Sequence, residues 1–167
     1  QNSFKKNKIK LYASGGMVFE DQNNETLINE MLKIKNQKFS GWKFRPPSPR
    51  NFKSHNQRIK SPDNINVKKI LNLSEQIRLK AGEKFDLMLD IGCRCKDLKD
   101  ARYLLEGLYE LNFKFVEEPI ARSPINYFNL NKKKFKKPKI AYGENVSSLE
   151  EIIPMLKNKV IDIFQPD

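Results

Sequence analysis

The sequence is poor in the residues on which several classes of protein depend. It contains 2 cysteines, Cys93 and Cys95, too few for a disulfide framework, which favours a reduced, cytoplasmic protein. No run approaches the roughly 20 apolar residues that a membrane helix needs, and the first residues lack the apolar core of a signal peptide. The chain starts without Met and stops on a strand-like Gln165-Pro166-Asp167, so we expect a piece of a longer protein.

Acidic residues are in the minority, with Asp+Glu 20 against Lys+Arg 32 and a formal net charge of +12. Such a surplus makes nucleic acid, an anionic membrane or a small anionic substrate plausible partners, and it indicates nothing about the fold. The basic run at 132–137 falls between a predicted helix and a predicted strand, which favours a solvated turn over a nucleic-acid patch. The single histidine, His55, falls in a long polar loop and is interpreted as a solvated side chain.

Short apolar runs alternate with amphipathic segments along the whole chain. The runs are too short for helices and rich in branched or aromatic residues, so they predict strands, at 9–13, 41–45, 85–90, 113–117, 139–144 and 160–164. Between them, apolar residues at helical spacing predict helices, around 27–32, 67–81, 98–108 and 149–156, with a weaker candidate after Pro124.

Alternating strands and helices predict parallel strands in a buried sheet. Asp90, Glu117 and Glu144 end three successive strands at intervals of 27 residues, and each interval has room for one βαβ step. This regularity predicts an incomplete (β/α) TIM-type barrel of about six strands, forming one domain over 1–167. A doubly wound open sheet is the alternative, but Ser14-Gly15-Gly16 is a poor match to its phosphate-binding turn. A proline-rich loop at 46–63 is predicted to be an active-site flap or, alternatively, a disordered insertion.

The three acids predict a metal site. Parallel barrel strands bring their carboxyl ends to one face, so Asp90, Glu117 and Glu144 are expected to lie close together. Alone they would repel one another and at least one would hold a proton, whereas a hard cation such as Mg²⁺ accepts such oxygen ligands. The alternative is that each acid is a solvated strand end.

Two cations, Lys43 and Arg45, share one face of the strand that precedes the acids. They could bind a carboxylate substrate or move a proton, because a lysine near other cations can act as a base while arginine stays protonated. The alternative is that both simply offset the acidic cluster.

The ordered set Lys-x-Arg, Leu-Asp, Glu-Glu-Pro, Gly-Glu-Asn and Gln-Pro-Asp resembles the mandelate racemase/muconate lactonizing branch of the enolase superfamily. The resemblance implies a barrel whose N-terminal capping domain and last strands are missing here, with Mg²⁺ on Asp90, Glu117 and Glu144. It also implies removal of a proton α to a carboxylate and stabilisation of the resulting enediolate. In the mandelate racemase group the last Asp, here Asp167, pairs with a histidine one strand later.

The chain departs from the family pattern at two motifs. Arg45 stands where the family often has a second lysine as base, so either the histidine beyond this chain or Lys43 would take the proton. The family's Asp-x-Asn is Asp90-Ile91-Gly92 here, and Arg94 is a candidate replacement for the lost amide.

We therefore expect a Mg²⁺-dependent lyase that dehydrates an acid sugar or another hydroxy-acid, with a racemase or epimerase as the alternative. Lys43, Arg45 and Asp167 are the predicted catalytic residues. We expect a small carboxylate substrate, no membrane, a homo-oligomer at full length and an isolated piece without activity. A basic nucleic-acid-binding protein is the alternative of another class, and it depends on the +12 charge alone.

Overall fold

The computed structural model describes residues 9–16, 23–46, 65–132 and 134–166. Within these residues, strands and helices alternate as the sequence predicts. The elements in chain order are β1 (Tyr12–Gly15), α1 (Asn24–Asn36), β2 (Gly41–Phe44), α3 (Val67–Ala81), β3 (Asp86–Asp90), α4 (Leu98–Glu110), β4 (Phe113–Glu117), α5 (Pro124–Asn131), β5 (Lys139–Tyr142), α6 (Leu149–Lys157) and β6 (Ile163–Phe164).

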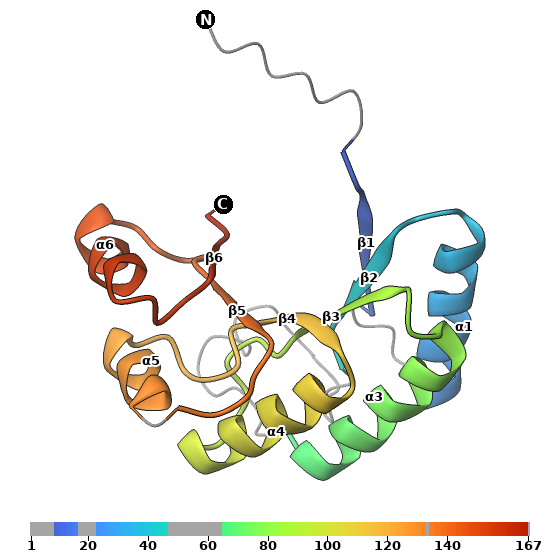
Figure 1. Cartoon of the computed structure of the whole chain (residues 1–167), viewed down its shortest axis with the longest axis horizontal. Coiled ribbons are helices and arrows are strands. Elements are labelled where there is room, and N and C mark those ends of the chain that lie inside the picture. The colour runs from blue at the N-terminus through green and yellow to red at the C-terminus, as the bar shows by residue number, and fades with distance from the viewer. Residues whose placement is uncertain (1–8, 17–22, 47–64, 133, 167) are drawn as a thin grey trace, which may run out of the picture.

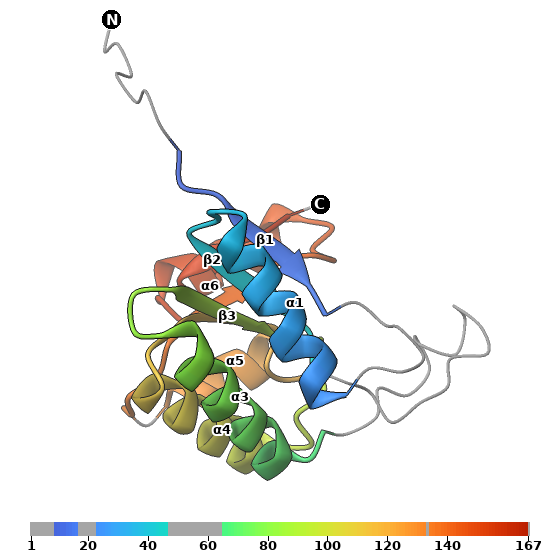
Figure 2. The same cartoon turned by 90° about the vertical axis from the view of Figure 1, so that its right-hand side faces the viewer.

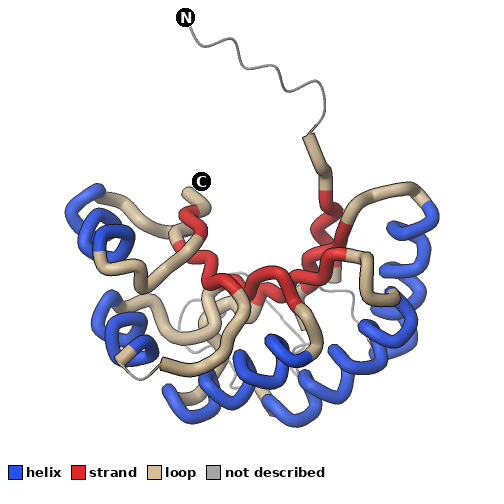
Figure 3. Tube along the Cα trace, viewed as in Figure 1, coloured by secondary structure: helices blue, strands red, loops and turns tan. Residues whose placement is uncertain are grey.

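All six strands pair in parallel, in the sequential order β1-β2-β3-β4-β5-β6. The sheet is curved into an arc, and the helices cover its convex side (Figures 1 and 3). Sequential order, curvature and helices on one side are the properties of a barrel wall, since a doubly wound sheet has helices on both faces. The predicted partial barrel is confirmed.

Alternation along the strands separates two apolar clusters. Trp42, Phe44, Leu87 and Leu89 point outward and join the main core with the helices. On the other face, Met88, Phe115 and Ala141 form a smaller cluster with Ile163 packed against it. The Tyr12 ring meets the Phe115 ring edge-on at 6.0 Å between centroids, so the curvature brings β1 towards β4 across the concave side.

The helices pack side by side along the outside of the arc. Figure 2 shows α1, α3 and α4 in successive contact. Gly107 on α4 permits a close approach to α3, since a Cβ there would lie 2.5 Å from a Leu71 methyl carbon. Asn23 and Thr26 form a capping box at the start of α1.

The edge where the strands begin is tied together by polar contacts. The buried Arg78 guanidinium donates to four backbone carbonyls, those of Leu111, Gly82, Phe85 and Asn112, at 2.8–2.9 Å. Lys114 pairs with Asp86 at 2.5 Å. The described residues of the basic run also lie here: Lys136 stands over the Tyr109 ring and Lys137 pairs with Asp162 at 3.6 Å. Lys136 and Lys137 therefore lie at the edge where the strands begin, and their contacts give the nucleic-acid alternative no support.

The structure corrects some predicted bounds. β1 covers 12–15 rather than 9–13, and β6 covers 163–164 rather than 160–164. The weak helix after Pro124 does form, as α5, because Tyr127 and Leu130 are buried from it. Among the described residues, none of the helices is both long and apolar enough to cross a bilayer. Apart from Pro46, the predicted loop at 46–63 lies outside the described residues, and so do His55 and Asp167.

Candidate active site

The carboxyl ends of the strands carry the predicted acids. Asp90 and Glu117, the last residues of β3 and β4, are register partners across the two parallel strands. Both are buried. The equal spacing read from the sequence therefore corresponds to a real juxtaposition, because each βα repeat returns the chain to the same edge of the sheet.

Lys43, on β2, lies against Glu117. Its Nζ donates to Glu117 Oε2 at 2.5 Å, and the two side chains are only 13% and 8% exposed. Burial lowers the pKa of Lys43, but the hydrogen bond to Glu117 and the charges of Glu117 and Asp90 outweigh it, so the pKa is raised. Lys43 is therefore held in its protonated form.

Arg45 follows β2 and pairs with Asp90. Its Nε donates to Asp90 Oδ2 at 2.9 Å, and Nη2 contacts the same oxygen. Burial lowers the pKa of Arg45, but the charge of Asp90 and the hydrogen bond between the two side chains have the larger combined effect. The pKa of Arg45 is therefore raised. Arg45 is a fixed positive charge and not a proton carrier.

Glu144 lies in the turn after β5, where Val146 N donates to Gly143 O at 3.0 Å. Its carboxylate is partly exposed, and Arg122 Nη2 approaches its Oε2 at 3.4 Å. Arg122 also pairs with the buried Glu118 at 2.7 Å. Glu144 is thus near the strand ends, and among the described residues the cation paired with it, Arg122, belongs to the loop after β4.

The three predicted metal ligands share one electrostatic environment. Burial raises the pKa of Glu117, and the charges of Asp90 and Glu144 raise it again, against the lowering effect of Lys43. Within the described ranges, however, no group of three or more His, Cys, Asp or Glu side chains is arranged to hold a metal ion. Asp90, Glu117 and Glu144 are each turned to a cation of the chain instead.

The residues nevertheless fit Mg²⁺ in their chemistry. Carboxylate oxygens at a strand edge are the hard ligands that this ion prefers. The raised pKa of Glu117 reflects burial and neighbouring negative charge, which a cation bound among the acids would relieve. Binding would require Glu117 and Asp90 to exchange Lys43 and Arg45 for the ion, whereas Glu144, which contacts Arg122 through Oε2, can offer Oε1 to it.

A family model described as enolase C-terminal domain-like matches residues 27–167. The chain belongs to this family. The match covers β2 to β6, and with them all the residues predicted for the site.

Solved structures of enolase-type proteins share the fold. A racemase from Streptomyces coelicolor A3(2) with bound magnesium is 17% identical, with a TM-score of 0.73 over 95% of this chain and 42% of that one. The 3,6-anhydro-D-galactonate cycloisomerase from Zobellia galactanivorans is 22% identical, with a TM-score of 0.71 over 95% of this chain and 38% of that one. A candidate dehydratase from Zymomonas mobilis ZM4 is also 22% identical, with a TM-score of 0.71 over 95% and 42%. The chain thus spans well under half of each structure. No curated protein matches it.

Two residues that the sequence patterns did not single out lie beside the predicted acids, and a third, Arg94, has contacts that differ from those expected of it. Glu118 and Arg122 were not singled out, although a second acid next to Glu117 and an arginine four residues later signal a pair. Arg94, proposed to replace a substrate-binding amide, is buried and donates to the carbonyls of Ile91 at 2.8 Å and Pro46 at 3.1 Å. It joins the loops after β2 and β3, so those contacts favour a structural role.

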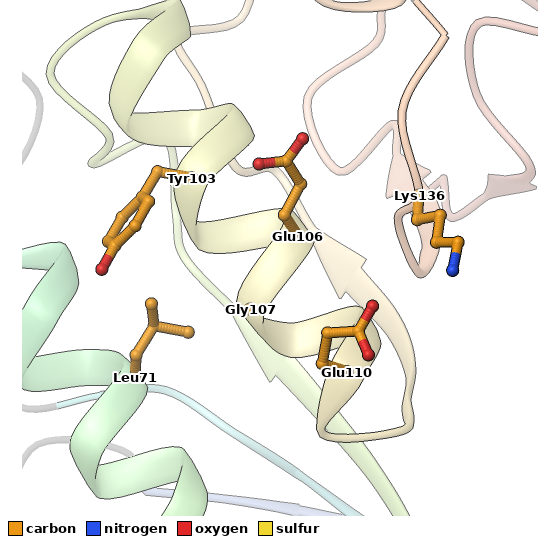
Figure 4. A pocket seen from close by; sticks show the side chains of 6 residues that line it. All are labelled: Leu71, Tyr103, Glu106, Gly107, Glu110 and Lys136. Atoms are coloured by element: carbon orange, nitrogen blue, oxygen red, sulfur yellow. The ribbon is translucent and has the colours of Figure 1, made fainter.

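A separate hollow lies on the outside of the helices, between α3 and α4 (Figure 4), and is lined by Leu71, Tyr103, Glu106, Gly107, Glu110 and Lys136. This hollow is remote from the carboxyl ends of the strands, so it has no part in the candidate site.

Proposed function

We propose that this chain forms part of a Mg²⁺-dependent enzyme that removes a proton α to a carboxylate, most simply in the dehydration of an acid sugar or another hydroxy-acid. The observation that carries the proposal is the alignment of Asp90 and Glu117 at one edge, with Lys43 and Arg45 in contact with them. Membership of the enolase family supports the same chemistry.

Mg²⁺ on Asp90, Glu117 and Glu144 would supply the positive charge that stabilises the enediolate oxygens once the proton leaves. Arg45 contributes a permanent charge beside the same edge and suits an anionic substrate. Lys43 carries a proton on Nζ at the same edge and would donate it to the β-hydroxyl as that group leaves. We assign removal of the α-proton to the histidine that Asp167 would orient, as the family resemblance implies.

A racemase or epimerase is the second candidate, because it shares the first step and one of the similar solved structures is that of a racemase. The substrate class, a homo-oligomeric state at full length and a cytoplasmic location are further proposals. The two cysteines are free thiols, which supports the last of these.

Mg²⁺ titration of the full-length protein tests the metal. We expect Mg²⁺ to raise the melting temperature of the wild type and to leave that of Glu144→Gln unchanged, since an ion that binds only the folded state stabilises it. A wild type whose melting temperature does not respond would remove the basis of the proposal.

A panel of hydroxy-acids in deuterated water tests the reaction. Dehydration of a 2,3-dihydroxy acid yields an enol that becomes a 2-keto acid, which semicarbazide detects by absorbance, whereas racemisation yields deuterium at the α-carbon without loss of substrate. If neither product forms with any member of a broad panel while Mg²⁺ binds, the assignment to hydroxy-acids is wrong.

A further inference from the structure

Glu118 is a buried acid for which the proposed mechanism has no use. Its residue is only 1% exposed, and its φ of 42° lies in the left-handed region that non-glycine residues rarely adopt. Its N–H donates to Ala141 O at 3.0 Å, and its carbonyl accepts from Cys93 N at 2.7 Å. The backbone of Glu118 therefore joins β5 to the loop that follows β3.

The Glu118 carboxylate is held from one side. Its Oε2 accepts from Arg122 Nε at 2.8 Å and from Cys93 Sγ at 3.3 Å, and Arg122 Nη2 forms an ion pair with it at 2.7 Å. Its Oε1 has no hydrogen-bond partner among the described residues. A buried carboxylate is unfavourable unless paired, and Arg122 is the cation that pairs with Glu118.

Arg122 extends this contact to Glu144, at 3.4 Å. An isolated ion pair of two partly exposed groups contributes little, because both long side chains must be ordered for it. Here Arg122 is already held by a hydrogen bond and an ion pair to Glu118, so its contact with Glu144 requires little further ordering. Cys93, Glu118, Arg122 and Glu144 thus connect the loops after β3, β4 and β5.

We propose that Glu118 and Arg122 are positioning residues that set the orientation of the Glu144 carboxylate for the metal; this rests on the function proposed above. The loops that these residues connect begin directly after Asp90 at the end of β3, after Glu117 at the end of β4, and after β5, where Glu144 itself lies. In this proposal Glu118 and Arg122 act on the metal through Glu144 and contact neither the substrate nor the ion. Groups that orient a metal ligand in this way change metal affinity by about 10–100-fold when they are removed.

Mg²⁺ affinity of the full-length protein, measured by isothermal titration, tests this role. We expect Arg122→Met to weaken binding by about 10–100-fold and Arg122→Lys to restore part of it, because lysine keeps the charge but not the planar fork. Lys114→Met is the matched control: it removes a cation from the pair with Asp86 at the opposite edge, and it should leave Mg²⁺ affinity unchanged.

The sign of the effect separates positioning from simple charge. Loss of a positive charge near the site should by itself tighten Mg²⁺ binding, so weaker binding identifies positioning. If Arg122→Met binds Mg²⁺ as tightly as the wild type or more tightly, the proposal is overturned, while the proposed function stands.

The double variant Glu118→Gln/Arg122→Met covers the case in which Arg122→Met does not fold, because it leaves no buried charge unpaired. It should fold, as shown by circular dichroism, and still bind Mg²⁺ weakly; wild-type affinity in the folded double variant would overturn the proposal. A wild type that does not bind Mg²⁺ would instead overturn the proposed function, and this inference with it.

Discussion

Replacing Lys43 by methionine keeps most of the length of the side chain and removes the charge that faces Glu117. The pair is 2.5 Å apart, and its side chains are 13% and 8% exposed. Breaking a buried pair from one side leaves an uncompensated charge and typically destabilises by 3–5 kcal/mol. We expect about 3 kcal/mol, the lower end of that range, because Glu117 can take up a proton instead of remaining charged.

Lys114→Met provides a control with the same substitution. Lys114 and Asp86 are also 2.5 Å apart, but their side chains are 52% and 32% exposed, and solvent screens such a pair. We expect a loss of about 0–1 kcal/mol. Urea unfolding without Mg²⁺, followed by the fluorescence of the buried Trp42, the single tryptophan of the chain, measures both values.

The loss in Lys43→Met should also depend on pH. Burial and neighbouring acids already raise the pKa of Glu117 above 4.5, and removal of Lys43 raises it further. The folded variant then holds this proton more tightly than the unfolded chain. In Lys43→Met, the stability that protonated Glu117 contributes is therefore fully present below pH 4.5. It is lost as pH rises through the pKa that Glu117 has in the folded variant. Equal losses in the two variants, or a loss in Lys43→Met that does not grow with pH, would refute the reasoning.

Three further outcomes follow from buried or crowded groups. Arg78→Lys should destabilise by about 1–3 kcal/mol in urea unfolding, because lysine leaves some of the four carbonyls that Arg78 binds without a donor; an unchanged midpoint would contradict this. Burial raises the pKa of Cys95 to about 12, so iodoacetamide at pH 8 should label it only after unfolding, as mass spectrometry can check. Gly41→Ala should destabilise by about 1–3 kcal/mol, since its Cβ would lie 2.5 Å from the Asp86 carbonyl oxygen; wild-type stability would show that β2 can shift.

The parts of the fold that sequence patterns predicted best are those whose side chains face the helices. β2 and β4 match their predicted ranges to within one residue, because alternation and buried aromatic residues define them. β1 was wrong because Ile9 and Leu11 look like strand residues but are 80% and 65% exposed. The pairing residues include Ser14 and Gly15 instead, opposite Lys43 and Phe44, and their small side chains give little pattern to detect.

The candidate site was predictable in position but not in its contacts. Regular spacing of the acids indicates a common edge, and the register of Asp90 with Glu117 agrees with it. Spacing does not indicate which cation faces which acid, since that depends on strand twist and side-chain rotamers. Arg122 was missed for this reason: it is recognised only once Glu118 is known to be buried and in need of a partner.

The two edges of the sheet use ion pairs for different purposes. At the edge where strands begin, Lys114–Asp86 and the carbonyls bound by Arg78 involve no group of the proposed mechanism, so changes there should alter stability and leave Mg²⁺ affinity unchanged. At the carboxyl edge, Lys43 and Arg45 hold acids that Mg²⁺ would have to share. The ion and Lys43 therefore compete for Glu117, and Lys43→Met should lose stability without Mg²⁺ but bind the ion more tightly than the wild type. Stability and metal affinity changing in opposite directions at this one residue would distinguish a binding edge from a structural one.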